Sequence, residues 1–135
     1  LIELLVVIAI IGLLSTLAVV ALNSARLKAR DAKRVADIKQ VQTALELYFN
    51  DESGYPTAFG TLGDTDFACL GSAGFTADGC AGAYMGLVPS NPEPNGSVYV
   101  YTSAGASVYE ITFTLEGKTG GLASGAHSAS QDGLR

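Results

Sequence analysis

The chain contains an almost unbroken run of apolar residues at positions 1–22, and this run constrains the fold more than any other feature. Only Glu3, Gly12 and the pair Ser15 and Thr16 interrupt it. About 20 such residues in an α-helix extend roughly 30 Å, enough to cross the hydrocarbon core of a bilayer. A cleaved secretory signal typically has a shorter apolar part preceded by basic residues, whereas here the basic residues follow. The sequence therefore predicts a membrane-spanning helix.

Glu3 is the only ionisable residue in this run. An ionised carboxylate in hydrocarbon is costly, so such a residue is expected to be paired or functional. One interpretation places Glu3 at the level of the lipid headgroups, since it stands two residues from Leu1. The other pairs it with a cation on a neighbouring subunit, and the residues alone leave both open.

The apolar run is followed by five basic residues, Arg26, Lys28, Arg30, Lys33 and Arg34. The positive-inside tendency would hold this end of the span in the cytoplasm. Acidic residues lie among these cations at positions 31 and 37, so charge alone leaves the orientation of the span open. We interpret the five cations as a solvated helix face. Contact with lipid headgroups, and with the acidic heads of neighbouring copies after assembly, is the functional alternative.

Residues 26–50 contain no Gly or Pro and are predicted to continue the helix. Their apolar residues recur at helical spacing and form one stripe, made of Val35, Ile38, Val41, Leu45 and Tyr48. A helix from near Leu1 to near Asp51 would be about 75 Å long. Gly54 is suited to a left-handed cap and Pro56 cannot continue the helix, so we expect the helix to end there.

The rest of the chain is predicted to form a small head, giving an α+β fold in which the apolar stripe packs on an antiparallel sheet. Residues 98–102 and 108–115 are rich in strand formers and should pair as a hairpin. The second segment has one apolar face, made of Tyr109, Ile111, Phe113 and Leu115. Residues 57–96 are rich in Gly and are expected to be a long loop with short helical turns, and a weaker strand is expected through Leu122 and beyond.

Two regions follow from this pattern. Residues 1–24 form the hydrophobic helix, and residues 25–135 form the amphipathic helix with the globular β head.

Cys69 and Cys80 are separated by ten residues in a Gly-rich stretch without a nearby histidine. This spacing suits a disulfide-closed loop better than a metal site. Reduced thiols in a cytosolic protein are the alternative, but the upstream membrane segment favours a head exported to an oxidising compartment. A disulfide here would stabilise the head by about 2–4 kcal/mol.

Residues 51–135 contain two basic residues, Lys118 and Arg135, against nine acidic ones, a net charge of −7. A surface of this sign repels phosphate backbones, so direct nucleic-acid binding by the head is not expected. The single histidine, His127, lies in a Gly/Ala/Ser-rich tail, and no nucleophile elbow, phosphate loop or metal-ligand spacing is present. We therefore expect neither enzymatic activity nor a cofactor. The tripeptide Asn95-Gly96-Ser97 fits the N-glycosylation pattern but is interpreted as a turn.

The first fourteen residues, LIELLVVIAIIGLL, closely resemble the N-terminal signature of type IV pilins and type II secretion pseudopilins. The resemblance implies that a prepilin peptidase removes a short basic leader. That leader and two mature residues are therefore expected ahead of Leu1, and different processing of this chain is the alternative. The resemblance also implies that Glu3 neutralises the N-terminal amine of an adjacent subunit and sets its register in the growing filament. The residues implied to form the filament-core helix are Leu4, Leu5, Val6, Val7, Ile8, Ile10, Ile11 and Gly12.

The chain departs from the family pattern in two places. Many family members have a helix-breaking proline several residues after the glycine that matches Gly12, whereas this chain has Val19, Val20 and Ala21. Melting of the helix at a proline is therefore not implied. Some pseudopilins bind calcium through acidic residues near the C-terminus, but only Asp132 lies in the last part of this tail, so no metal site is expected.

The resemblance implies a structural subunit that polymerises through its hydrophobic helix into an extracellular type IV pilus. Before assembly the subunit would reside in the inner membrane, and its partners would be copies of itself, the prepilin peptidase and the pilus assembly machinery. A type II secretion pseudopilin, which forms a short periplasmic filament, is the first alternative. A monomeric membrane-anchored adhesion module is the second. These residues do not distinguish adhesion, motility, DNA uptake and conduction as the task of the filament. They also do not distinguish a major from a minor subunit.

Overall fold

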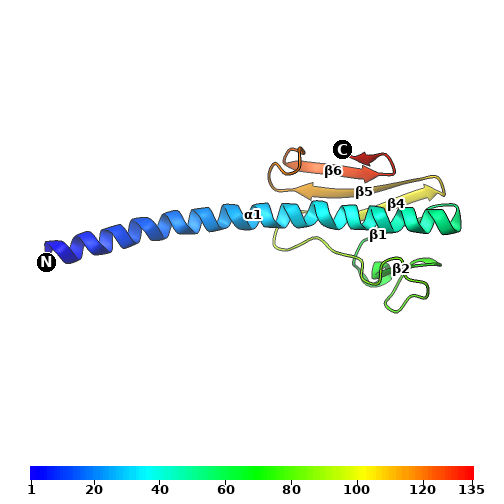
Figure 1. Ribbon diagram of the computed structural model, residues 1–135, viewed down its shortest axis with the longest axis horizontal. Coiled ribbons are helices and arrows are strands. Elements are labelled where there is room, and N and C mark those ends of the chain that lie inside the picture. Colours follow the sequence, from blue (N-terminus) through cyan, green and yellow to red (C-terminus); the bar gives the residue numbers. More distant parts are fainter.

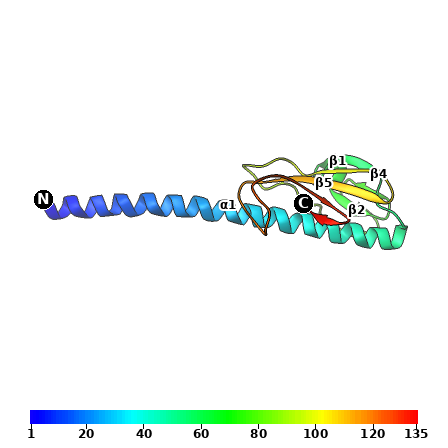
Figure 2. The same ribbon diagram turned by 90° about the horizontal axis from the view of Figure 1, so that it is seen from above.

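One long helix dominates the computed structural model, which describes residues 1–135. Helix α1 (Ile2–Glu52) is continuous over 51 residues. Its N-terminal half projects away from the head, and its C-terminal half lies along the head (Figure 1, Figure 2). By length and composition α1 is the one helix that could cross a membrane, and none of its apolar window is buried within the chain. The predicted helix, including its amphipathic continuation, is confirmed.

The end of α1 differs from the prediction. The residue in the left-handed conformation is Ser53 (φ 59°, ψ 26°), whose N–H donates to the carbonyl of Phe49 at 2.8 Å. The prediction that Gly54 forms this cap is wrong. A Cβ on Gly54 would lie 2.7 Å from the Cβ of Ala106, so the glycine permits a close approach between the end of α1 and a turn of the head. The N–H of Tyr55 then donates to the carbonyl of Ala106 at 2.7 Å.

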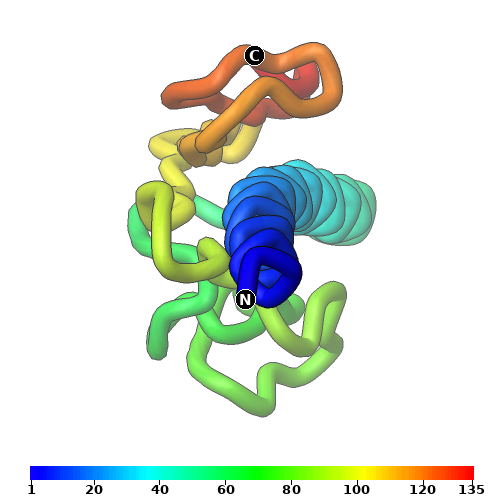
Figure 3. The backbone as a smooth tube through the Cα atoms, turned by 90° about the vertical axis from the view of Figure 1, so that its left-hand side faces the viewer, coloured from blue at the N-terminus to red at the C-terminus, as the bar shows by residue number.

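An antiparallel sheet of five strands, in the order β1-β4-β5-β6-β7, forms one side of the head. Its strands are β1 (Ala58–Thr61), β4 (Val100–Gly105), β5 (Val108–Leu115), β6 (Gly125–Ser130) and β7 (Gly133–Leu134). A separate two-stranded sheet contains β2 (Cys69–Gly71) and β3 (Gly74–Thr76), and follows the 3-10 helix η1 (Thr65–Phe67). Figure 3 looks along α1 from its N-terminal end and shows β5 to β7 on one side of the helix and residues 60–90 on the other.

The hairpin prediction is confirmed, with shifted bounds. Strand β4 begins two residues later than expected and extends to Gly105, and the weak last strand is β6, which begins at Gly125 and is followed by β7. Residues 57–96 contain the predicted loop, with its disulfide and a helical turn, η1, but they also contain β1, β2 and β3, which were not predicted. These strands are only three or four residues long; β1 pairs with the distant β4, whereas β2 and β3 pair with each other. Gly60 of β1 lies so close to Phe67 that a Cβ would be 2.1 Å from the ring.

The core lies between α1 and the sheet. The predicted apolar face of β5 is buried along its whole length, at Tyr109, Ile111, Phe113 and Leu115. From the helix, Ile38, Val41 and Leu45 are fully buried, and Val35 and Tyr48 are partly buried against the same cluster. Each fully buried aliphatic side chain contributes about 1.5–3 kcal/mol. The predicted packing of the helix stripe on the hairpin is therefore confirmed.

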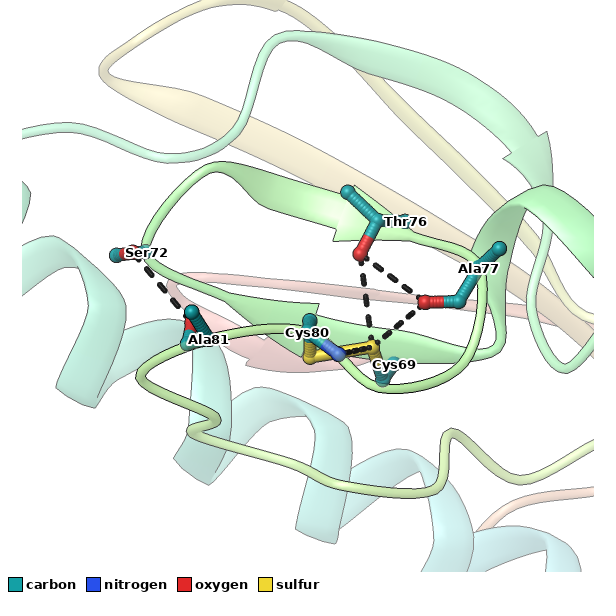
Figure 4. The surroundings of a disulfide bond; sticks show 6 residues. All are labelled: Cys69, Ser72, Thr76, Ala77, Cys80 and Ala81. Carbon is teal, nitrogen blue, oxygen red and sulfur yellow. Dashed lines mark hydrogen bonds between the residues drawn. A yellow bond between two sulfur atoms is a disulfide. The ribbon is translucent and has the colours of Figure 1, made fainter.

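Cys69 and Cys80 are joined in the predicted disulfide, with their Cα atoms 6.3 Å apart. Figure 4 shows the bond beside β2, with Thr76 and Ala77 of the neighbouring segment next to the Cys69 sulfur. The N–H of Cys80 lies 3.2 Å from that sulfur. The disulfide therefore closes the loop that contains β3 onto β2.

Candidate functional site

The projecting half of α1 is the largest exposed apolar surface of the chain. Every side chain from position 2 to position 26 is exposed. The predicted filament-core residues expose 51–65% of their area, and they are Leu4, Leu5, Val6, Val7, Ile8, Ile10 and Ile11. A Cβ on Gly12 would have no neighbour within 4 Å. Monomeric soluble proteins rarely expose such a continuous apolar surface, so lipid or other helices must cover this one.

Glu3 lies in the first turn of α1, where the positive end of the helix dipole favours a negative charge. Within this single chain Glu3 is exposed and forms no ion pair. No cation within residues 1–135 therefore neutralises it. The assembly role of Glu3 stays a prediction.

Helix α1 is unbroken at the positions where the family resemblance would allow a helix-breaking proline. Val19, Val20 and Ala21 are helical and exposed. The hydroxyl of Thr16 donates to the carbonyl of Leu13 at 2.8 Å, so this polar group is satisfied inside the apolar segment.

A buried arginine lies where α1 meets the head. Arg34 is 0% exposed, and its guanidinium lies against Glu116 and residues 91–95 of the head. Its five N–H donors are all used, and their acceptors are Asp31 Oδ1, Glu116 Oε1, Asn91 Oδ1 and the carbonyls of Pro92 and Asn95. Both bonds from Nη1 to the carboxylates measure 2.7 Å. A buried guanidinium with every donor satisfied holds the segment around Asn91 and the end of β5 against the helix.

The two carboxylates beside Arg34, those of Asp31 and Glu116, make different contacts. Asp31 is fully buried and accepts the backbone N–H groups of Glu116 at 2.9 Å and Gly117 at 2.7 Å. It therefore ties the turn after β5 to α1. Glu116 forms a two-pronged pair with Arg30, with both N···O distances at 2.7 Å. We call Arg30, Asp31, Arg34 and Glu116 the ionic cluster.

The pKa of Glu116 is lowered to about 2, first by the hydrogen bonds from Arg30 and then by those from Arg34 and Asn95. Burial opposes this shift but is the weaker effect. The carboxylate therefore stays ionised over the whole physiological range.

A second polar contact lies further along α1. The carboxylate of Asp37 accepts a hydrogen bond from the Tyr99 hydroxyl at 3.2 Å and from Lys33 at 2.7 Å. Burial and the neighbouring Asp37 carboxylate raise the pKa of the Tyr99 hydroxyl.

The comparison with known proteins agrees with this architecture. No family model matches the chain, and no solved structure matches it. The type II secretion system core protein G of Vibrio cholerae is 29% identical over 129 residues, which span 93% of this chain and 85% of that protein. The resemblance to the type IV pilin and pseudopilin family is confirmed. This similarity supports a pilin-like structural subunit, and the choice between pilus and pseudopilus is a separate question.

In this pilin-like chain, the interpretation of the five cations as a solvated face is wrong for Arg30 and Arg34. Both pair with Glu116, more than eighty residues away in the sequence. Asp31 and Arg34 are three residues apart, on the side of the helix that contains the apolar stripe, and this spacing was the signal for a buried pair. Only Arg26 and Lys28 remain exposed without an ion pair.

The other residues singled out from the sequence have structural surroundings. Both ring nitrogens of His127 face backbone carbonyls, those of Arg135 at 2.9 Å and Ala123 at 2.7 Å. Asp132 pairs with Arg135 at 3.6 Å, and no group of three or more potential metal ligands is present. Gly96 adopts φ +92° in the turn after Asn95.

Proposed function

We propose that this chain is the structural subunit of a helical filament, held together by the projecting half of α1. The observation that supports the proposal is the contrast between the two halves of the molecule. The head has its own buried core, whereas the projecting half of the helix buries nothing within the chain. At about 25 cal/mol per Å² of apolar surface, covering this helix supplies a strong driving force for insertion in a bilayer and, after extraction, for packing against copies of itself.

Of the two filament types, we propose a pseudopilus of the type II secretion kind. The similarity to core protein G of Vibrio cholerae extends over most of both chains and favours this choice over the extracellular type IV pilus. The pilus stays the second candidate, because an exposed apolar helix with an unpaired Glu3 suits either filament. In both, the inner membrane would hold the subunit before assembly, and a prepilin peptidase and an assembly machine would act on it.

A catalytic role forms no part of the proposal. The only histidine faces backbone carbonyls through both ring nitrogens, and Asp132, the one acidic residue in the tail after His127, pairs with Arg135. A monomeric membrane-anchored adhesion module would also expose α1 to lipid. That alternative predicts no polymer and no effect of neutralising Glu3.

The experiment is deletion of the gene in its native host, followed by complementation with the wild-type chain or the Glu3→Gln variant. Loss of enzyme secretion on deletion supports a pseudopilus, and loss of long surface fibres seen by electron microscopy supports a pilus. Glu3→Gln should abolish or greatly reduce the filament while the head stays folded, because an unmatched buried charge at the neighbour's amine costs several kcal/mol. Normal filament yield from Glu3→Gln contradicts the assembly role.

The matched control is Glu52→Gln. It makes the same chemical change at the other end of α1, at an exposed position. Filament yield from this variant should equal the wild-type yield.

A further inference from the structure

The edge of the sheet at β1 is acidic. Asp64 lines three open hollows that meet there, one with Asp66, one with Asp78 and one with Glu93. None of these four carboxylates forms an ion pair within the chain. We call Asp64, Asp66, Asp78 and Glu93 the acidic edge.

Large apolar side chains are exposed among these carboxylates. Phe59 and Leu87 are each 77% exposed and Val98 is 54% exposed. Each lines one of the three hollows together with Asp64. Strand β1 is also an outer strand of the five-stranded sheet, so no further strand covers this side. Exposed apolar patches rimmed by polar residues mark sites of protein interaction.

The opposite charge is found at another place on the same chain. Lys118 follows Gly117, whose N–H donates to Asp31 and which lies against Leu27 of α1. Lys28 is the next residue after Leu27, so the two lysines lie at the same level of the helix. Both are exposed, and neither forms an ion pair. We call Lys28 and Lys118 the basic corner.

We propose that the acidic edge of one copy docks on the basic corner of a second copy. This inference rests on the proposed filament function and names one of its contacts. The two surfaces differ from each other, so the contact is head to tail and each copy keeps one free surface of each kind. Such a contact continues into a filament when the rotation from one copy to the next does not close a ring. Opposite charges also steer the incoming copy into register.

The positions of the two surfaces determine the offset between the copies. The segment that contains Asp78 and Leu87 is held at the C-terminal end of α1, where the Tyr84 hydroxyl donates to Asp51 at 2.8 Å. The basic corner lies at Asp31, where Gly117 is held. Figure 1 shows the same separation, with β2 near the C-terminal end of α1 and the connection between β5 and β6 near its middle. Twenty helical residues correspond to about 30 Å, so a contact made through Asp78 staggers parallel copies by about that distance along the filament axis.

The contact can be tested with a zero-length carbodiimide, which joins a lysine amine to a carboxylate only when the two are in contact. The reagent is applied to membranes and to sheared filaments, both taken from cells of the native host that produce the full chain. The cross-linked dimer from the wild type should contain Lys118 or Lys28 joined to a residue of the acidic edge, as identified by mass spectrometry. Because Asp78 lies about 30 Å from the basic corner within one chain, a link to it must join two copies. Glu93 is left out of this identification, because the carbonyls of Pro92 and Asn95 on either side of it accept hydrogen bonds from Arg34, near the basic corner, and a lysine could reach it within one chain.

Charge reversals then identify the partners. Asp66→Lys and Lys118→Glu should each lower the yield of cross-linked dimer and of filament about fivefold or more, the effect of about 1 kcal/mol. The combined variant restores the opposite charges in exchanged positions, so its yields should return to within about twofold of wild type, as expected for residues in direct contact. Asp78→Lys serves as a second acidic-edge variant, because Asp66 lies within η1.

Matched controls place the same charge changes elsewhere. Glu110→Lys on β5 and Lys39→Glu on α1 both alter exposed residues without an ion pair, and both should behave as wild type. If the wild type forms filaments but the edge and corner variants match these controls, the docking contact is overturned and the filament function stands. If the wild type forms neither filament nor cross-linked dimer, both proposals fail.

Discussion

Replacement of Arg34 by Met tests whether the ionic cluster holds the head on α1. The Met side chain fills much of the space of Arg34 but removes all five donors. Asp31 then keeps only two backbone N–H groups, and Glu116 keeps Arg30 and Asn95. Removing one partner from a buried ion pair leaves an uncompensated charge and costs about 3–5 kcal/mol. Arg34 is 0% exposed, so water cannot replace the lost donors without opening the head.

Thermal unfolding of the detergent-solubilised full chain, followed by near-UV circular dichroism of its tyrosines, measures this loss. For a head of about 100 residues, each kcal/mol lowers Tm by about 4 °C, so Arg34→Met should lower Tm by roughly 12–20 °C. Arg34→Lys should recover less than half of the loss, because an ammonium has only three donors and cannot reproduce the planar fork.

Lys39→Met is the control for the loss of one positive charge from α1. Lys39 is exposed and has no ion pair, so its Tm should change by less than about 2 °C. A drop of less than 4 °C for Arg34→Met, which is about 1 kcal/mol, would refute the reasoning. It would mean that solvent reaches the cluster and screens it.

Three further predictions concern the stability of the head. The folded state holds the proton on Glu116 more weakly than the unfolded chain, so this group stabilises the head fully above about pH 4.5 and ceases to do so as the pH falls to about 2. Glu116→Gln should flatten the dependence of the urea midpoint on pH in that interval. If the midpoint of the variant depends on pH as steeply as that of the wild type, Glu116 is not the group responsible. The buried hydroxyl of Tyr109 has no hydrogen-bond partner within the chain, so Tyr109→Phe should keep or raise the unfolding free energy, by up to about 1 kcal/mol; a clear loss would reveal a hidden partner. Replacing Cys69 and Cys80 by Ser should cost about 2–4 kcal/mol in urea unfolding without loss of far-UV helix signal, and a fall in helix content would show that α1 depends on the loop.

Some elements could be predicted because they depend on residues that are close together in the sequence. The spacing of Ile38, Val41 and Leu45 predicts a buried helix face, and the alternation along residues 109–115 predicts a strand with one apolar face, since each periodicity belongs to one type of backbone. Both are confirmed by burial. The disulfide was predictable for a similar reason, because Cys69 and Cys80 are the only two cysteines and lie close in the chain.

Other elements could not be predicted, because the local sequence carries too little pattern or because they depend on contacts with residues far away in the chain. Strands β1, β2 and β3 are too short for a periodic pattern, and β1 exists through its pairing with β4, about forty residues later. The left-handed cap fell on Ser53 because Gly54 was needed for its contact with Ala106. A glycine is permitted both roles, and only the position of the head decides between them.

The sequence by itself determined the long helix, its apolar first half, the amphipathic stripe, the hairpin and the pilin-like signature around Glu3. Each of these depends on residues that are neighbours in the chain. Only the tertiary structure decided which charges are buried, because all acceptors of Arg34 other than Asp31 lie 57 to 82 positions away from it. The cost of removing a charge from water depends on partners brought together by folding, and the local spacing of Asp31 and Arg34 indicates only one of those partners.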